Sequence, residues 1–173
     1  MNVVDKYKGW EVDLIRQDVQ ANVLDHAICM VNFEYDFNLG TLVRNANAFG
    51  AREVFYVQDR KKWDRRSSVG VQNYTDVIHL KTLYDLFDLR DKYTFVAVEN
   101  GIGAKRLGKF KWPKNSLIIM GSENQGIPQD VLNFCQYKVE IPMMGSVRSL
   151  NVGTASGIVL NDYVSKYNKS WFK

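Results

Sequence analysis

Residues 141–157 read IPMMGSVRSLNVGTASG, and they connect a predicted strand to a predicted helix over 150–166. A tight loop that contains Pro142 and Gly145 joins the two elements. Ser149 suits the N-cap of this helix, so a purely structural role is open to it. An N-cap does not explain the run of small residues GTASG at 153–157. Small side chains on a helix face let a second backbone approach closely, so we expect tight packing against this helix.

Outward from this segment, short apolar runs alternate with longer amphipathic stretches. The apolar runs predict strands at 27–32, 53–58, 76–80, 93–99, 116–121 and 137–141. The amphipathic stretches predict helices at 38–49, 83–90, 128–134 and 150–166. This alternation is typical of an α/β fold with a mostly parallel sheet flanked by helices, and we expect a single domain over residues 1–173.

Ligands of such sheets bind beyond the carboxyl ends of the strands, which directs attention to three turns. The first opens the segment NFEYDFNLGTLVRNANAFGA at 32–51, where Asn38 suits a helix N-cap and Arg44 follows nearly two turns later. The second lies in IIMGSENQGIP at 118–128, where a strand ends in glycine before Glu123. The third is the loop described above. Taken singly, a cap for Asn38 and surface positions for Arg44 and Glu123 are the simplest interpretations.

In this order and at these separations, the three segments resemble the three signature motifs of the SpoU/TrmH branch of the SPOUT methyltransferases. The first motif is matched by Asn38, Gly40, Arg44 and Ala48-Phe49-Gly50. The second is matched by Gly121, Glu123 and Gly126. The third is matched by Ile141, Pro142, Met143, Gly145, Ser149, Leu150, Asn151 and Val152. The chain departs from the pattern at Gly153-Thr154-Ala155, where many members have Ser-x-Ala. Three ordered matches are far more specific than a lone glycine motif.

The resemblance implies that residues 116–165 thread a trefoil knot, a topology that element spacing alone could never suggest. In the family this knot binds S-adenosylmethionine in a bent form, and two chains pair as a homodimer. The final helix is then expected at the interface between the two chains. By position, the expected cofactor contacts are Val98, Glu99, Met120, Gly121, Ile141, Met143, Ser149 and Leu150.

The resemblance also implies methyl transfer to a ribose 2′-hydroxyl of RNA. The sulfonium methyl of the cofactor is already activated, so catalysis consists mainly of placing the hydroxyl in line with it. The residues expected to serve the reaction are Asn38, Arg44, Glu123, Ser149 and Asn151. A guanidinium stays charged in proteins, so we expect Arg44 to grip a phosphate and stabilise the developing alkoxide. The motifs leave the proton acceptor open.

Composition sets wider limits. Hydrophobic residues make up 46% of the chain, which is enough for a packed core, but no apolar run is long enough to cross a membrane. Charges run throughout residues 1–17, so no secretory signal is expected. Cys29 and Cys135 have no CxxC neighbour, which argues against a disulfide framework or a zinc site. We therefore expect a reducing, cytoplasmic setting and no metal.

The net charge of +4 permits a polyanionic partner, and two segments concentrate the cations, RKKWDRR at 60–66 and KRLGKFKWPK at 105–114. We expect Phe110 and Trp112 in the second segment to be exposed for base stacking. Neither histidine lies in a motif, so we expect His26 and His79 to be structural, and we keep His26 as a secondary candidate for an RNA contact because it precedes the first strand. With RNA as the expected substrate, the phosphate contacts are assigned to Arg60, Lys61, Lys62, Arg65 and Arg66.

Two other classes stay open. A Rossmann-type methyltransferase would use Gly101-Ile102-Gly103 after the strand at 93–99, but its third glycine, Gly108, comes too late. The second open class is a non-catalytic RNA-binding module of the same fold. The presence of a suitable residue at every expected catalytic position argues against it. Among RNA substrates we prefer tRNA to rRNA, because no accessory domain of the rRNA type is recognised and the extension at 1–26 suits tRNA contacts.

Overall fold

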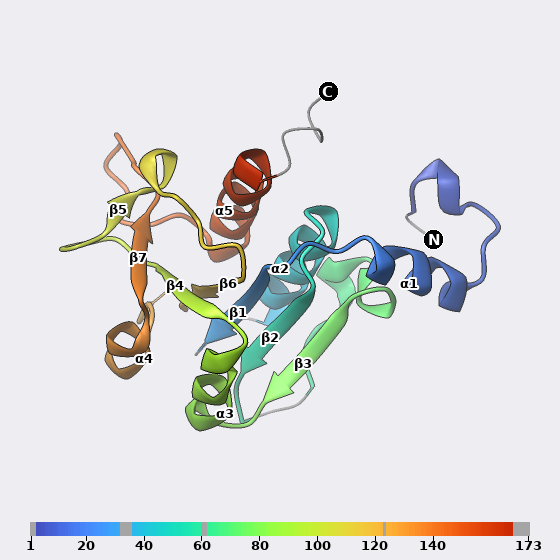
Figure 1. The fold of residues 1–173 in the computed structure, drawn as a ribbon, viewed down its shortest axis with the longest axis horizontal. Coiled ribbons are helices and arrows are strands. Elements are labelled where there is room, and N and C mark those ends of the chain that lie inside the picture. Colours follow the sequence, from blue (N-terminus) through green and yellow to red (C-terminus); the bar gives the residue numbers. More distant parts are fainter. Residues whose placement is uncertain (1–2, 32–35, 60–61, 123, 168–173) are drawn as a thin grey trace.

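The computed structural model describes residues 3–31, 36–59, 62–122 and 124–167, which fold around one sheet (Figure 1). Seven strands within these ranges form the sheet in the order β3-β2-β1-β6-β4-β7-β5, and every neighbouring pair is parallel. The strands are β1 (Ala27–Val31), β2 (Glu53–Val57), β3 (Asp76–Leu80), β4 (Thr94–Val98), β5 (Lys105–Arg106), β6 (Ser116–Met120) and β7 (Tyr137–Glu140).

Helices cover both faces of the sheet (Figure 1). One face is covered by α2 (Asp36–Ala48) and α5 (Val152–Tyr167), and the other by α3 (Leu83–Phe87) and α4 (Gln129–Phe134). The remaining helix, α1 (Val12–Ala21), lies beside the β3 edge, where Gln20 donates a hydrogen bond to the carbonyl of Tyr74. Short 3-10 helices complete the chain, η1 (Asp5–Tyr7), η2 (Arg66–Ser68), η3 (Val71–Asn73), η4 (Asp88–Asp91) and η5 (Leu107–Lys109).

Burial explains the order of the strands. Every residue of the central strands β1 and β6, AICMV and SLIIM, is buried. The edge strand β3, DVIHL, is only partly buried, and its sequence is more polar. A strand that is covered on both faces must be apolar throughout, so the continuous apolar runs belong at the centre. The predicted α/β fold with a mostly parallel sheet is confirmed.

Small side chains allow α5 to pack closely against α2. A Cβ on Gly153 would lie 2.8 Å from Cγ2 of Thr41, and one on Gly157 would lie 3.4 Å from Nδ2 of Asn45. The amide of Asn45 donates hydrogen bonds to the Gly153 carbonyl (2.8 Å) and to Oγ of Ser156 (2.9 Å). The small residues that predicted a close approach therefore face α2 of the same chain.

The predicted start of the first motif helix is wrong by a half turn. Because α2 begins at Asp36, Asn38 lies inside its first turn and is not an N-cap. A tertiary contact supports this longer first turn, since Oγ of Ser67 in η2 donates to the Phe37 carbonyl (2.6 Å). Local sequence could not reveal that contact.

The final helix also starts later than predicted, at Val152. Its N-cap is Asn151 and not Ser149, because Oδ1 of Asn151 accepts the backbone N–H of Thr154 (3.2 Å). Two further elements, α1 and the two-residue β5, were not predicted at all. Among the helices of the described ranges, none is long and apolar enough to cross a membrane.

Candidate functional site

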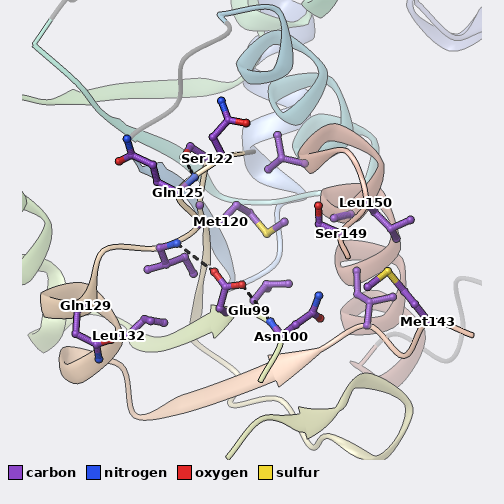
Figure 2. A pocket seen from close by; sticks show the side chains of 18 residues that line it. Glu99, Asn100, Met120, Ser122, Gln125, Gln129, Leu132, Met143, Ser149 and Leu150 are labelled. Carbon is purple, nitrogen blue, oxygen red and sulfur yellow. Dashed lines mark hydrogen bonds between the residues drawn. The ribbon is translucent and has the colours of Figure 1, made fainter. Parts of the chain in front are cut away.

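A cavity of about 500 Å³ lies at the carboxyl ends of β4, β6 and β7, where open α/β sheets bind ligands. In Figure 2, Ser149, Leu150 and Met143 lie on one side of it and Gln129 and Leu132 on the other. The structure brings all of the predicted cofactor contacts together around this cavity, namely Val98, Glu99, Met120, Gly121, Ile141, Met143, Ser149 and Leu150. These residues come from three segments that are far apart in the sequence.

The turn after β6 explains the glycine at the strand end. Ser122 and Gly126 form an isolated antiparallel bridge, with backbone N–H···O distances of 3.2 and 3.1 Å. This bridge folds the chain back over Gly121, where a Cβ would lie only 2.2 Å from the carbonyl carbon of Gly126. Only glycine fits there, so the backbone of this turn forms part of the cavity wall.

Glu99 holds the same turn from the end of β4. One carboxylate oxygen accepts the backbone N–H of Ile127 (3.1 Å), and the other accepts that of Asn100 (3.2 Å). Gly126 adopts a left-handed φ of +66°, and a Cβ there would lie 2.6 Å from the Glu99 carboxylate. The carboxylate therefore sits against the backbone of the turn, and it fixes one wall of the cavity (Figure 2).

The loop between β7 and α5 forms the opposite wall. The side-chain amide of Asn100 donates to the carbonyl of Arg148 (3.1 Å), which ties this loop to the end of β4. Ser149 is exposed and lines the cavity, while Leu150 is partly buried against the core. The first turn of α5 completes the wall with Val152 and Ala155.

Two of the predicted catalytic residues meet between α2 and α5. Nδ2 of Asn151 donates to Oδ1 of Asn38 (3.0 Å), so the first and third motifs touch across 113 positions of sequence. Since Oδ1 of Asn151 also caps α5, this one side chain fixes the helix start and its contact with α2 together.

Arg44 lies further along α2 and is exposed. Neither Arg44 nor Asn38 lines the 500 Å³ cavity, so the predicted site residues fall into two neighbouring groups. Asn151 belongs to the second group, along the open groove between α2 and α5. The remaining predicted catalytic residue, Glu123, lies outside the described residues.

The predicted RNA contacts at 60–66 are only partly described, because Arg60 and Lys61 lie outside the described residues. Lys62, Arg65 and Arg66 are exposed, as phosphate contacts must be. However, Arg66 is paired with Asp64 (2.6 Å), and its hydrogen bonds lower the pKa of the Asp64 carboxyl to about 2. The charge of Arg66 is therefore already balanced within the segment.

Two expectations about exposed side chains are wrong. Phe110 and Trp112 are only 2% and 4% exposed, because both rings pack beneath α5, where the Trp112 indole donates to Asp162 (2.8 Å). His26 is fully buried against Tyr163, with ring centroids 4.2 Å apart, so the structural role is confirmed and the secondary option of an RNA contact is wrong. In both cases α5 covers side chains whose local sequence is polar or basic, and such long-range burial is invisible in a single segment.

Several cavity residues were missed by the sequence interpretation. Asn100, Gln125 and Gln129 line the cavity with polar side chains, and Leu132 contributes apolar surface. A signal existed for Asn100 and Gln125, since each follows a predicted strand end within a few residues. Gln129 and Leu132 lie on α4, and nothing local indicates that this helix faces the cavity.

The glycine loop after β4 does not support the Rossmann-type alternative. Gly101 and Gly103 adopt left-handed φ values of +128° and +83°, and the chain continues into the short strand β5 instead of a helix. A dinucleotide-type loop must open a helix whose N-terminus receives the phosphates. In the described parts of the chain, no cluster of three or more His, Cys, Asp or Glu side chains could hold a metal ion.

A protein-family model and several known proteins match most of this chain. The model of the SpoU rRNA Methylase family matches residues 25–161. The mouse tRNA (guanosine(18)-2′-O)-methyltransferase TARBP1 is 29% identical over 135 residues, which are 73% of this chain and 8% of that protein. The 23S rRNA (guanosine-2′-O-)-methyltransferase RlmB of Coxiella burnetii is 33% identical over 128 residues, 71% of this chain and 51% of that protein. The chain thus spans less than two thirds of the length of these relatives.

Solved structures share the fold. The TrmH/SpoU tRNA modifying enzyme of A. aeolicus superposes with a TM-score of 0.80 at 20% identity, covering 92% of this chain and 83% of that one. The SpoU methyltransferase AviRb from Streptomyces viridochromogenes superposes with a TM-score of 0.77 at 21% identity, covering 92% and 65%. At these identities the likeness concerns the parallel sheet and its covering helices.

Proposed function

The chain belongs to the SpoU rRNA methylase family, and from this premise we propose that it transfers the methyl group of S-adenosylmethionine to a ribose 2′-hydroxyl of RNA. The observation that carries the proposal is the cavity at the strand ends, because the predicted contacts from the end of β4 and from the second and third motifs all line it. The two relatives named above as guanosine 2′-O-methyltransferases support the same reaction.

The cavity suits S-adenosylmethionine. Its volume of about 500 Å³ falls within the range of about 300–1,000 Å³ that is typical of small-molecule sites. Met120, Ile141 and Leu150 offer apolar surface, and Asn100 offers a side-chain amide beside the backbone of the Gly121 turn. When bound, the cofactor supplies a sulfonium methyl group that is already activated for transfer.

Residues of this chain must therefore place the ribose and stabilise its oxygen. In our proposal, Arg44 grips the adjacent phosphate and stabilises the developing alkoxide, since a guanidinium stays protonated. Asn38 and Asn151 hold each other across α2 and α5, and they position the surface on which the target nucleotide rests. Ser149 lines the cavity at its rim, next to that surface. We also keep Glu123 among the catalytic residues.

We further infer that residues 116–165 form the trefoil knot and that residues 1–173 form a single domain. Support for the knot comes from the strand order, because β6 and β7 follow each other in the chain and yet β4 lies between them. The loop that follows β7 is then bound to Asn100 at the end of β4. Support for a single domain comes from the sheet, which contains every described strand.

A homodimer is part of the proposal. Arg44 and Asn38 do not line the cavity of their own chain, so a second chain can bring such residues to the bound cofactor. The open groove between α2 and α5 offers a surface for this pairing, with Ile158 exposed beside it. We place the protein in the cytoplasm, because both described cysteines are free thiols.

The RNA substrate is proposed to be tRNA, with rRNA as the alternative. Relatives are named for each of these substrates, so the family alone does not choose between them. The protein should be incubated with S-adenosylmethionine and either total tRNA or total rRNA, and new 2′-O-methyl groups mapped by mass spectrometry. Labelled tRNA is expected, whereas labelled rRNA with untouched tRNA would reverse the preference.

Arg44→Ala tests the reaction. We expect at least about 100-fold slower methyl transfer, the usual cost of losing one charged group that stabilises an oxyanion. Binding of S-adenosylhomocysteine, measured by calorimetry, should change less than about twofold, because Arg44 does not line the cavity. Arg44→Lys keeps the charge without the forked geometry and should retain part of the rate. Near-normal turnover of Arg44→Ala would contradict the assignment.

The second candidate is a non-catalytic RNA-binding module of the same fold. Such a module would not bind the cofactor in the cavity, whereas the enzyme must. Calorimetry of the folded wild-type protein with S-adenosylhomocysteine separates the two. Measurable binding supports the enzyme, and its absence favours the module.

A further inference from the structure

A second, larger cavity of about 710 Å³ lies at the β3 edge of the sheet, away from the strand ends that form the first. Its walls come from α1, β2, β3 and the segment 62–75. Its lining includes the aromatic side chains of Tyr56, Trp63 and His79 and the cationic side chains of Arg16, Lys62 and Arg65. Apart from the phosphate contacts predicted for Lys62 and Arg65, no role proposed above involves this cavity.

Three rings contribute to its walls, and that of Tyr56 is only 3% exposed. Tyr56 and His79 are register partners on the neighbouring strands β2 and β3, so their rings stack with centroids 5.0 Å apart and an interplanar angle of 26°. His79 is fixed in this position, because its Nε2 bonds the Gln58 carbonyl (2.7 Å). Trp63 lies in the opposite segment, and the guanidinium of Arg65 is 6.0 Å from the centre of its ring.

The charges at the cavity are predominantly positive and only partly compensated. Arg16 forms an ion pair with Asp76, and Arg66 forms one with Asp64. Within the described residues, no ion pair is recorded for Lys62 or Arg65, and both are exposed at the cavity. These two cations are therefore available to an anionic ligand.

We propose that this cavity binds an unpaired nucleotide of the RNA substrate, with its base against the rings of Trp63 and His79 and its phosphate on Lys62 and Arg65. The inference rests on the proposed function, since it assumes an RNA substrate. Unpaired RNA bases are recognised by stacking on aromatic and guanidinium faces, and their phosphates by Lys and Arg. The amides of Gln72 and Asn73 line the same cavity and can bond the edge of a base.

The cavity is mechanically connected to the helix that carries Asn38 and Arg44. The segment that contains Trp63 and Arg65 continues into η2, which rests on the first turn of α2. A Cβ on Gly40 would lie 2.0 Å from Oγ of Ser67 and 3.0 Å from the backbone nitrogen of Ser68, so η2 packs closely on α2 at this glycine. A nucleotide held in the cavity is thereby kept at a constant position relative to α2, and the cavity selects RNAs with an unpaired nucleotide at that spacing from the target ribose.

The test uses the full chain and adenosine and uridine 5′-monophosphates as probes, followed by the indole N–H signals in nitrogen–proton NMR spectra. A saturable shift of the Trp63 signal is expected. The Trp112 signal is the internal control, because that indole is buried and bonded to Asp162. Inorganic phosphate alone should not reproduce the shift. No shift of Trp63, or an equal shift with inorganic phosphate, overturns the inference.

Variants locate the contacts. Trp63→Ala and Arg65→Ala should each weaken nucleotide binding about tenfold, as expected for loss of a stacking or phosphate partner. Trp63→Phe keeps a ring and should lose much less, and Arg90→Ala removes an exposed arginine outside the cavity and should lose nothing. Arg65 is exposed, so its variant remains informative even if Trp63→Ala fails to fold. Unchanged affinity of the Arg65→Ala variant would overturn the phosphate contact and the proposal with it.

The effect of these variants on methyl transfer is measured separately from nucleotide binding. With an RNA that the wild type methylates, Arg65→Ala should raise KM for RNA while leaving kcat and S-adenosylhomocysteine binding unchanged. A fall in kcat at saturating RNA would instead mean that Arg65 belongs to the reaction centre, which overturns the inference. If the wild type methylates no RNA and the Trp63 shift persists, the proposed function fails while the nucleotide site is supported.

Discussion

At the scale of single residues, His26 is a buried imidazole whose ring nitrogens find no hydrogen-bond partner among the described residues. Its ring packs against that of Tyr163, and burial lowers its pKa to about 4. Burial disfavours the charged imidazolium, so His26 stays neutral in the folded chain at pH values below 6.5, where it becomes protonated in the unfolded chain. His26 therefore links stability to pH without taking part in binding.

The sign of this linkage is definite. As the pH falls through about 6.5 the unfolded chain is protonated first, and the free energy of unfolding declines until the folded chain also titrates near 4, by about 3 kcal/mol in all. His26→Phe should remove this part of the pH dependence. Urea unfolding of both proteins between pH 7.5 and 4.5 measures it, and equal declines in the two would contradict the prediction.

Gly121 provides a residue-scale test of the cavity. In Gly121→Ala the new Cβ would meet the backbone of Gly126 at 2.2 Å, and backbone cannot move aside as a flexible side chain can. Such overpacking costs about 1–3 kcal/mol, so we expect S-adenosylhomocysteine to bind about tenfold or more weakly in calorimetry. Gly108→Ala is the matched control, because its Cβ would meet nothing within 4 Å. Full affinity of the Gly121 variant would show that the turn does not shape the site.

At the scale of elements, the strands could be predicted because burial on both faces requires an uninterrupted apolar run, as in β1 and β6. The burial of Phe110 and Trp112 could not be predicted from local sequence, because it depends on α5, which begins about 40 residues further along the chain. The start of α2 was misplaced for the same reason, since η2 holds its first turn. The local sequence pattern thus predicts the helices and strands well. It fails for side-chain exposure and helix starts that depend on contacts with another element.

The segment 62–68 carries a prediction of this kind, because its two adjacent arginines have different surroundings. Arg66 is paired with Asp64, whereas no ion pair is recorded for Arg65 in the described chain. Arg65→Ala should lower the salt dependence of RNA binding, as a slope of log K against log salt, by about one. Arg66→Ala should lower it much less. Filter-binding titrations over a range of salt concentrations measure both slopes, and equal effects would contradict the pairing.

At the scale of the whole molecule, the residues that line the cavity at the strand ends were predictable because parallel strands deliver their carboxyl ends to one edge. Two features could not be predicted, namely the hydrogen bond between Asn38 and Asn151 and the cavity at the β3 edge. Each of them joins segments that only the folded chain brings together. The sequence resemblance indicated the family, whereas only the folded structure separates the motif residues that line the cavity from Asn38, Arg44 and Asn151, which do not line it.

Under the proposed function, that division predicts that two chains must pair for the reaction to occur. Ile158 is 37% exposed on α5 beside the α2–α5 groove, and a charge there would be buried in the proposed interface. Ile158→Glu should therefore yield a folded monomer by light scattering that retains S-adenosylhomocysteine binding and loses methyl transfer. Tyr84→Glu places the same charge on α3, on the other face of the sheet, at a side chain that is 79% exposed, and should stay dimeric and active. A monomeric Ile158→Glu protein with full activity would mean that each chain completes its own site, and Arg44 would then have to reach the cavity of its own chain.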